Sequence, residues 1–424
     1  MEDPDQRHVQ VSFFSHAEEI PGTKDVVIDV PISADWENLN SLVNSIASAA
    51  SDVEWKEKRY ELLIGSTFIR STLDEFIEEN HLEVEKVVKI ECVSGYEPPT
   101  PFLGLSGPDW ISTVHTTEKL FISTSYNGEV TVWDRKGKQV SSTTREPGAI
   151  KAACIISNPT EGTKGLKMVT GGESSTIWIQ EWNELGEATP VAALRGHARS
   201  VESVSIGAKG TRLLSGSFDH TLKVWNLEAN DADVFESRTG KESKRRKENE
   251  SFVTKIPMVT LSSHSDAVVA LEWSKEKEGH AFSASWDHFI LLWDLELAGE
   301  VTRIRAQRAF TSIHLNPFSS LIIAGLTDAL PRLFDPRSSE GSFVKQTFVG
   351  HKGWISCARW TGRNQYSFIS SSFDGTVKMW DIRSSKTSVF DISGHEDRVL
   401  SCCVSNGVIL SGGVDAKVNI FNFP

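Results

Sequence analysis

The stretch SSSFDGTVKMWD (residues 370–381) returns in outline as SASWDHFILLWD (residues 283–294) and SGSFDHTLKVWN (residues 215–226). Each copy has a serine, an aspartate four residues later and a tryptophan six residues after that. A catalytic motif is normally needed once, whereas a structural unit can be needed many times. The repetition therefore indicates a repeat architecture.

The spacing of the copies defines the repeat. Seven expected strands end in Trp or Phe followed by Asp or Asn: Trp133-Asp134, Trp182-Asn183, Trp225-Asn226, Trp293-Asp294, Phe334-Asp335, Trp380-Asp381 and Phe421-Asn422. From Trp293 onward they are 41, 46 and 41 residues apart, close to the ~40–45 residues of a four-stranded propeller blade. Short β-branched runs alternate with turn signals between them. Residues 107–424 resemble the WD40 family, which implies a mainly β, seven-bladed β-propeller.

The WD40 resemblance also implies a structural network in each blade. Its members are a Gly-His histidine, a strand serine, a turn aspartate and the strand-end tryptophan. The matching sets are His197, Ser215, Asp219 and Trp225; His264, Ser283, Asp287 and Trp293; and His351, Ser370, Asp374 and Trp380. A buried indole N–H needs an acceptor and a buried carboxylate needs donors, so the four residues can satisfy one another.

Serine, histidine and aspartate together also suggest a hydrolase triad. The set recurs in several blades without a Gly-rich nucleophile elbow, which favours the structural interpretation. Degenerate copies agree with it: the fifth blade has Ala324 and Phe334, the first has Asn127, and the second has no turn aspartate, so its register stays open.

Composition indicates the cellular compartment of the protein and shows where its negative charge lies. Residues 1–95 hold 20 acidic and 8 basic residues, whereas the remainder holds 37 and 36. An acidic N-terminal domain is a poor ligand for phosphate backbones and a better one for a cationic or metal-bearing partner. The five cysteines lie in strand-like runs, and neither a secretory signal nor a membrane span is visible. We therefore expect a soluble intracellular protein without a membrane role.

The secondary-structure pattern of residues 1–95 differs from that of the repeats. Strand patterns at residues 8–14 and 25–31 precede a helical pattern at 37–48, and further strands are expected at 60–65, 67–70 and 84–93, with a short helix starting near Ser71. This order is that of an α+β, ubiquitin-like β-grasp. The Pro-rich EPPTP then indicates a linker, which we assign to residues 96–106.

The whole chain resembles the WD repeat-containing protein 12 family, called the YTM family in fungi. The markers are FFSHAEEI, YELLIGSTFIRSTLDEFIEEN, VEKVVKIECV, DWIST, SASWDH, LFDPR and ISGHEDRVLS. The resemblance implies a non-enzymatic ribosome assembly factor without a cofactor. It also implies the PeBoW complex, with Pescadillo and the block-of-proliferation protein. That complex matures large-subunit rRNA on pre-60S particles, in the nucleolus and nucleoplasm of the nucleus.

The same resemblance implies one site. Family members dock their ubiquitin-like (NLE) domain on midasin, an AAA ATPase, where a glutamate before the last strand completes a divalent-metal site. Glu85 occupies that position here, and Glu83 could share the role because the loop register is open. A hard divalent cation takes oxygen ligands, so an open position accepts a carboxylate from a partner. The alternative is that both are solvated charges.

An insertion at about residues 227–255 interrupts the repeats. It is polar and lacks periodicity, so we expect a disordered loop. Five basic residues gather in it: Lys241, Lys244, Arg245, Arg246 and Lys247. Three interpretations stay open: a nuclear-import signal, a contact with pre-rRNA, or a solvated charged loop.

Two other function classes compete with the assembly factor. Ubiquitin-like and WD modules also occur in substrate adaptors of ubiquitin ligases, but an F-box-like helix pair is missing from the sequence. An enzyme is the second rival. The sequence carries no Walker loop, no metal-ligand cluster and no unrepeated triad.

Overall fold

The computed structural model describes residues 7–16, 20–24, 26–51, 55–82, 86–159, 162–228, 234–237, 251–275, 277–338 and 343–423. The chain divides into two compact units. One comprises Met1–Pro98 with Asp381–Thr387, and the other comprises Pro99–Trp380 with Ser388–Pro424.

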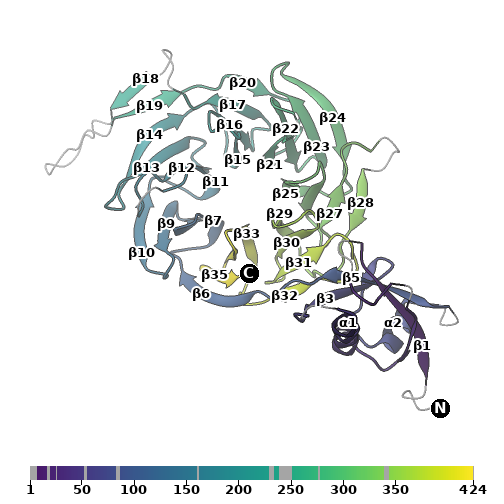
Figure 1. Ribbon diagram of the computed structural model, residues 1–424. Helices are drawn as coiled ribbons and strands as arrows, with labels where there is room; N and C mark the ends of the chain where they lie inside the picture. The colour runs from purple at the N-terminus through teal and green to yellow at the C-terminus, as the bar shows by residue number, and fades with distance from the viewer. Residues whose placement is uncertain are drawn as a thin grey trace. The chain divides into compact units, whose positions relative to one another are not determined.

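The first unit contains a five-stranded mixed sheet with two helices (Figure 1). Its elements are β1 (His8–Phe14), β2 (Ile28–Pro31), α1 (Trp36–Ala50), β3 (Tyr60–Ile64), β4 (Thr67–Phe68), α2 (Leu73–Asn80) and β5 (Val88–Ser94). The strand order is β2-β1-β5-β3-β4, with β1 and β5 parallel. The order of these elements along the chain is the β-grasp order predicted from the sequence.

Capping side chains explain where the two helices begin. Asp35 caps α1 by accepting from the backbone N–H of Asn38 at 2.9 Å. Thr72, one residue after the predicted start, caps α2 by accepting from the N–H of Glu75.

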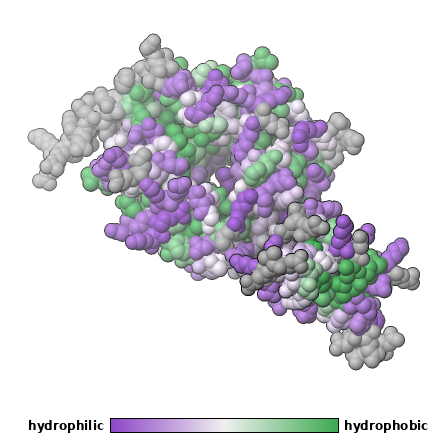
Figure 2. Space-filling view, viewed as in Figure 1, coloured by the Kyte–Doolittle hydropathy of each residue, from purple (hydrophilic) through white to green (hydrophobic). Residues whose placement is uncertain are grey.

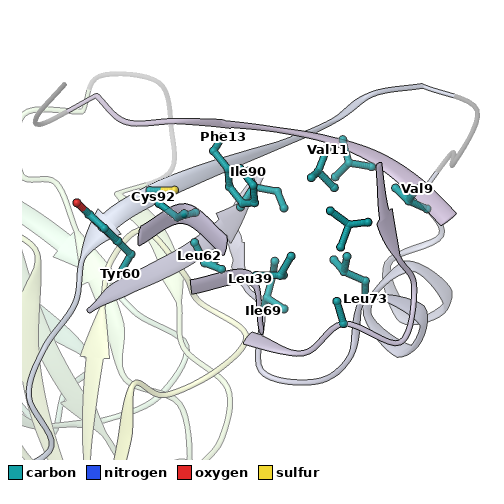
Figure 3. Packing of buried hydrophobic residues seen from close by; sticks show 14 of the residues in the cluster. Val9, Val11, Phe13, Leu39, Tyr60, Leu62, Ile69, Leu73, Ile90 and Cys92 are labelled. Carbon is teal, nitrogen blue, oxygen red and sulfur yellow. The ribbon is translucent and has the colours of Figure 1, made fainter. Parts of the chain in front are cut away.

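Alternate residues of β1 and β5 then face the helices. Figure 3 shows side chains from both strands and from α1 meeting in one apolar core, among them Val11, Leu39 and Ile90, which are fully buried.

The second unit is the propeller, whose described strands form seven sheets arranged in a ring (Figure 1). The first blade has β7 (Ile111–Thr116), β8 (Leu120–Ser125), β9 (Glu129–Asp134) and β10 (Gln139–Thr144). The second has β11 (Ile150–Ser157), β12 (Lys167–Gly172), β13 (Ile177–Trp182) and β14 (Ala188–Leu194). The third has β15 (Val201–Ile206), β16 (Arg212–Ser217), β17 (Leu222–Asn226) and β20 (Val259–Leu261).

The remaining blades follow the same antiparallel plan. The fourth has β21 (Val268–Trp273), β22 (His280–Ser285), β23 (Phe289–Asp294) and β24 (Gly299–Arg305). The fifth has β25 (Phe310–Leu315), β26 (Ile322–Leu326), β27 (Arg332–Phe334) and β28 (Val344–Thr347). The sixth has β29 (Ile355–Trp360), β30 (Ser367–Ser372), β31 (Val377–Asp381) and β32 (Phe390–Ile392). The seventh has β33 (Val399–Ser405), β34 (Val408–Gly413), β35 (Lys417–Asn422) and β6 (Thr100–Ser106).

The last blade borrows a strand from the start of the unit. β6 pairs antiparallel with β35, so the ring is closed by hydrogen bonds between sequence-distant segments. Residues 100–106 lie in the segment expected to be a linker, which therefore contributes a propeller strand. Its prolines, Pro98, Pro99 and Pro101, conceal the strand in the sequence because proline weakens a strand assignment.

The insertion between β17 and β20 also contains strands. β18 (Val234–Ser237) and β19 (Ser251–Lys255) extend the sheet of the second blade, with β19 parallel to β14. The expectation of a disordered loop is wrong for these two segments, because their backbones continue the edge of an existing sheet. Residues 229–233 and 238–250 lie outside the described residues.

Candidate functional site

The predicted glutamates belong to the loop between α2 and β5. Glu83 and Glu85 both lie outside the described residues. The described residues on either side are anchored: His81 caps α2 in the left-handed conformation, Leu82 packs on the domain core, and Val88 opens β5 beside Val11. The connection therefore runs from the C-terminal end of α2 to the start of a buried strand, with both of its ends fixed.

The structure brings together each predicted blade network. In the third blade, Nδ1 of His197 lies 2.8 Å from Oδ2 of Asp219, and Nε2 lies 2.7 Å from Oγ of Ser215. The indole N–H of Trp225 donates to the same Oγ at 2.8 Å. Since a carboxylate only accepts, Nδ1 carries the hydrogen, and the serine hydroxyl donates to Nε2.

The other two sets repeat this geometry. His264, Ser283, Asp287 and Trp293 are linked by contacts of 2.7, 2.7 and 2.8 Å. His351, Ser370, Asp374 and Trp380 are linked by three contacts of 2.8 Å. The three serine side chains are fully buried. A water-activating or acyl-transfer role would need substrate access to that hydroxyl, so the geometry favours a structural role.

Electrostatics support the same conclusion. Burial raises the pKa of the Asp374 carboxyl, but hydrogen bonds from the N–H of Lys352, from Thr376 and from His351 lower it more, to about 2. The pKa of Asp219 is likewise driven well below its usual range against the effect of burial. Both aspartates therefore stay ionised and hold the loop and the turn together near neutral pH.

Sequence reasoning missed a network in the seventh blade. His395 contacts both carboxyl oxygens of Asp415 at 3.0 and 3.1 Å, and its Nε2 lies 2.8 Å from Oγ of Ser411. Phe421 stands at the tryptophan position, which hid the set. The signals that could have found it are the Gly-His pair and the aspartate in the following turn.

In the second blade, a glutamate and a serine take the place of the histidine and the aspartate that link the loop to the turn in other blades. Glu146 lies in the loop before β11, and one of its oxygens accepts from the hydroxyl of Ser174 in the turn after β12. Its Oε1 is buried and has no hydrogen-bond partner among the described residues. Burial raises the pKa of this carboxyl to about 7, although the Ser174 hydrogen bond lowers it. The blade thus keeps a loop-to-turn contact without histidine or aspartate.

Glu146 should make stability depend on pH. A carboxyl whose pKa is raised by folding stabilises the fold fully below its unfolded pKa, and this contribution is lost as pH rises to about 7. We expect Glu146→Gln to gain stability relative to the unmodified chain between pH 5 and pH 8, by about 3 kcal/mol at 1.36 kcal/mol per pKa unit. Urea unfolding at several pH values measures the difference. Exposed Glu118→Gln should show no such trend.

Paired aromatic side chains occur beside the turns of several blades. Trp110 packs edge-on against Tyr126, Trp286 packs edge-on against Phe218, and Trp354 stacks on Phe373. The three tryptophans remain 40 to 54% exposed. Exposed tryptophans are frequent anchors of protein interfaces, so these positions are candidates for partner contact.

No cluster of three or more His, Cys, Asp or Glu side chains that could hold a metal ion occurs in the part of the chain that the structure describes. Within the same residues, no helix has the length and apolarity to cross a membrane.

These features define a class: a β-grasp domain followed by a WD propeller whose recurrent polar networks are structural. Comparison with known proteins is consistent with it. The NLE (NUC135) domain matches residues 9–77, and the "WD domain, G-beta repeat" matches residues 188–226, 255–294 and 342–381.

Full-length relatives are similar over nearly the whole chain. A "Ribosome biogenesis protein WDR12 homolog" from Caenorhabditis briggsae is 43% identical, covering 98% of this chain and 95% of the relative. Homologs of the same name from Brugia malayi (41% identical, 93% and 91% covered) and Ixodes scapularis (32%, 97% and 98%) agree. The chain belongs to the WDR12 family of ribosome biogenesis proteins.

Proposed function

We propose that this chain is a non-enzymatic assembly factor of the large ribosomal subunit. It joins Pescadillo and the block-of-proliferation protein in the PeBoW complex and supports rRNA processing on pre-60S particles in the nucleolus and nucleoplasm. The observation that carries the proposal is the full-length similarity to ribosome biogenesis proteins, with both domain types in the same order. The buried serines of the blade networks support a scaffold rather than a hydrolase.

The N-terminal domain serves as the handle for midasin. Glu85, or Glu83 in its place, supplies a carboxylate oxygen to the divalent metal of the ATPase's adhesion site. The ATPase then drives release of this chain from the particle. Two features support this. The described residues on either side, Leu82 and Val88, are held by the domain core and by the pairing of β5 with β1. The acidic balance of residues 1–95 favours a metal-bearing partner.

The basic residues of the insertion, Lys241, Lys244, Arg245, Arg246 and Lys247, lie outside the described residues. We propose that they direct nuclear import, because five positive charges within seven residues match the composition of such signals. A contact with pre-rRNA is the alternative use of the same charge.

Sedimentation tests the proposed function. A tagged copy of the full chain should travel with pre-60S particles in a sucrose gradient, and its affinity purification should recover both PeBoW partners. Depleting the chain should lower the amount of mature large-subunit rRNA. Recovery of cullin adaptors in place of pre-60S components would instead support the ubiquitin-ligase adaptor.

A further inference from the structure

The propeller encloses a channel of about 560 Å³, and the innermost strands of its blades supply the lining. The visible face of the propeller in Figure 2 is hollowed near its centre. The lining includes Glu272 from β21, His314 from β25, and Cys357 and Arg359 from β29. Cys357 belongs to this lining, with 8% of its surface exposed.

A second thiol lies beside Cys357. Cys402 belongs to β33, the innermost strand of the next blade, and its side chain is fully buried. The Sγ of Cys357 lies 3.7 Å from the carbonyl oxygen of Cys402, and the Sγ of Cys402 lies 4.0 Å from the carbonyl oxygen of Cys357. Each sulfur thus lies in contact with the other residue's backbone, so the two cysteines are direct neighbours on adjacent blades.

The surroundings shift the pKa of the two thiols in opposite directions. A hydrogen bond from the Cys402 thiol lowers the pKa of Cys357; burial opposes this and the positive charge of Arg359 reinforces it. Burial raises the pKa of Cys402 well above its usual range, and the neighbouring Cys357 side chain adds to this effect. Both shifts favour Cys357 over Cys402 as the sulfur that ionises. A channel-lining cysteine beside an arginine, with a second thiol next to it, resembles the arrangement of peroxide-sensitive cysteines.

The chain's other cysteines lack this combination. Burial raises the pKa of both Cys92 and Cys154 to about 12. Burial also raises the pKa of Cys403, despite the nearby Arg359. These three thiols are protonated near neutral pH and serve as internal controls.

We propose that Cys357 and Cys402 form a peroxide-oxidisable dithiol that links the sixth and seventh blades. The Cys357 thiolate attacks one oxygen of hydrogen peroxide, the O–O bond breaks, and hydroxide leaves. The resulting sulfenic acid is attacked by the Cys402 sulfur, which forms the S–S bond, while the sulfenic hydroxyl and the thiol proton leave as water. The two thiols lose two electrons and the peroxide gains them.

Mass spectrometry of the unreduced full chain tests this. After treatment with hydrogen peroxide, digestion should yield a cross-linked peptide pair containing Cys357 and Cys402, which a dithiol reductant separates. The bridge closes a loop across 45 residues, so the oxidised chain should melt about 5 °C higher than the reduced chain. Absence of this cross-link from the folded chain, with intact Cys357, would overturn the proposal.

Variants separate the two steps. Cys402→Ser should leave Cys357 as a sulfenic acid that a dimedone probe captures, and Cys357→Ser should yield no such adduct. Arg359→Gln should slow the first step about tenfold, because the thiolate loses its neighbouring positive charge. Cys154→Ser should leave the cross-link unchanged. Equal rates of cross-linking in the Arg359→Gln chain and the unmodified chain would contradict the role of the arginine.

Discussion

Glu85→Ala is expected to abolish capture of the midasin adhesion domain by the full-length chain, with affinity falling about 100-fold or more. The carboxylate is proposed to fill an open position on the partner's divalent cation, and neither water nor a methyl group replaces that charged ligand within the interface. Chelating the cation should release the unmodified chain to the same extent. A quantitative pull-down or calorimetric titration measures both effects.

A series at the same position separates charge from reach. Glu85→Gln keeps the shape but removes the charge, and Glu85→Asp keeps the charge but withdraws it by one methylene, so both should bind more weakly. Glu83→Ala decides between the two glutamates of the loop. Glu79→Ala, an exposed position on α2, is the matched control and should bind normally. Unchanged capture by Glu85→Ala and by Glu83→Ala would remove the metal-ligand assignment.

The recurrent motif could predict the propeller because it encodes contacts local to one blade. His264, Ser283, Asp287 and Trp293 fall within thirty residues, and their spacing fixes which side chains can meet. The residue after the turn aspartate takes a positive φ in these blades, 74° at His288 and 81° at Gly375. These are the positions where a tight turn needs the left-handed region.

Contacts between sequence-distant segments could not be predicted in the same way. β6 pairs with β35 across more than three hundred residues, and no local pattern carries that information. The strand β19 joins β14 because the insertion returns to a free sheet edge. Glu146 was also missed, because its partner Ser174 belongs to no recurrent motif. For the site itself, the sequence identifies Glu83 and Glu85 only through the family resemblance.

Ser283→Ala is expected to lower the free energy of unfolding of the propeller by about 3 kcal/mol. Its hydroxyl accepts from the indole N–H of Trp293 at 2.8 Å and contacts Nε2 of His264 at 2.7 Å. Removing it leaves two buried polar groups without their partner, and each such group costs about 1–3 kcal/mol. Urea unfolding followed by circular dichroism measures the loss. Ser262→Ala, at an exposed position just before His264, is the control.

The fifth blade suggests how the loss can be offset. It carries Ala324 and Phe334 at the serine and tryptophan positions, both fully buried, so an apolar pair fills this space without an indole N–H. Adding Trp293→Phe to Ser283→Ala removes the orphaned donor. The double variant should therefore be more stable than the sum of the two single losses predicts, by about 1 kcal/mol. If the two losses simply add, the Ser283 hydroxyl contributes to stability independently of the indole of Trp293.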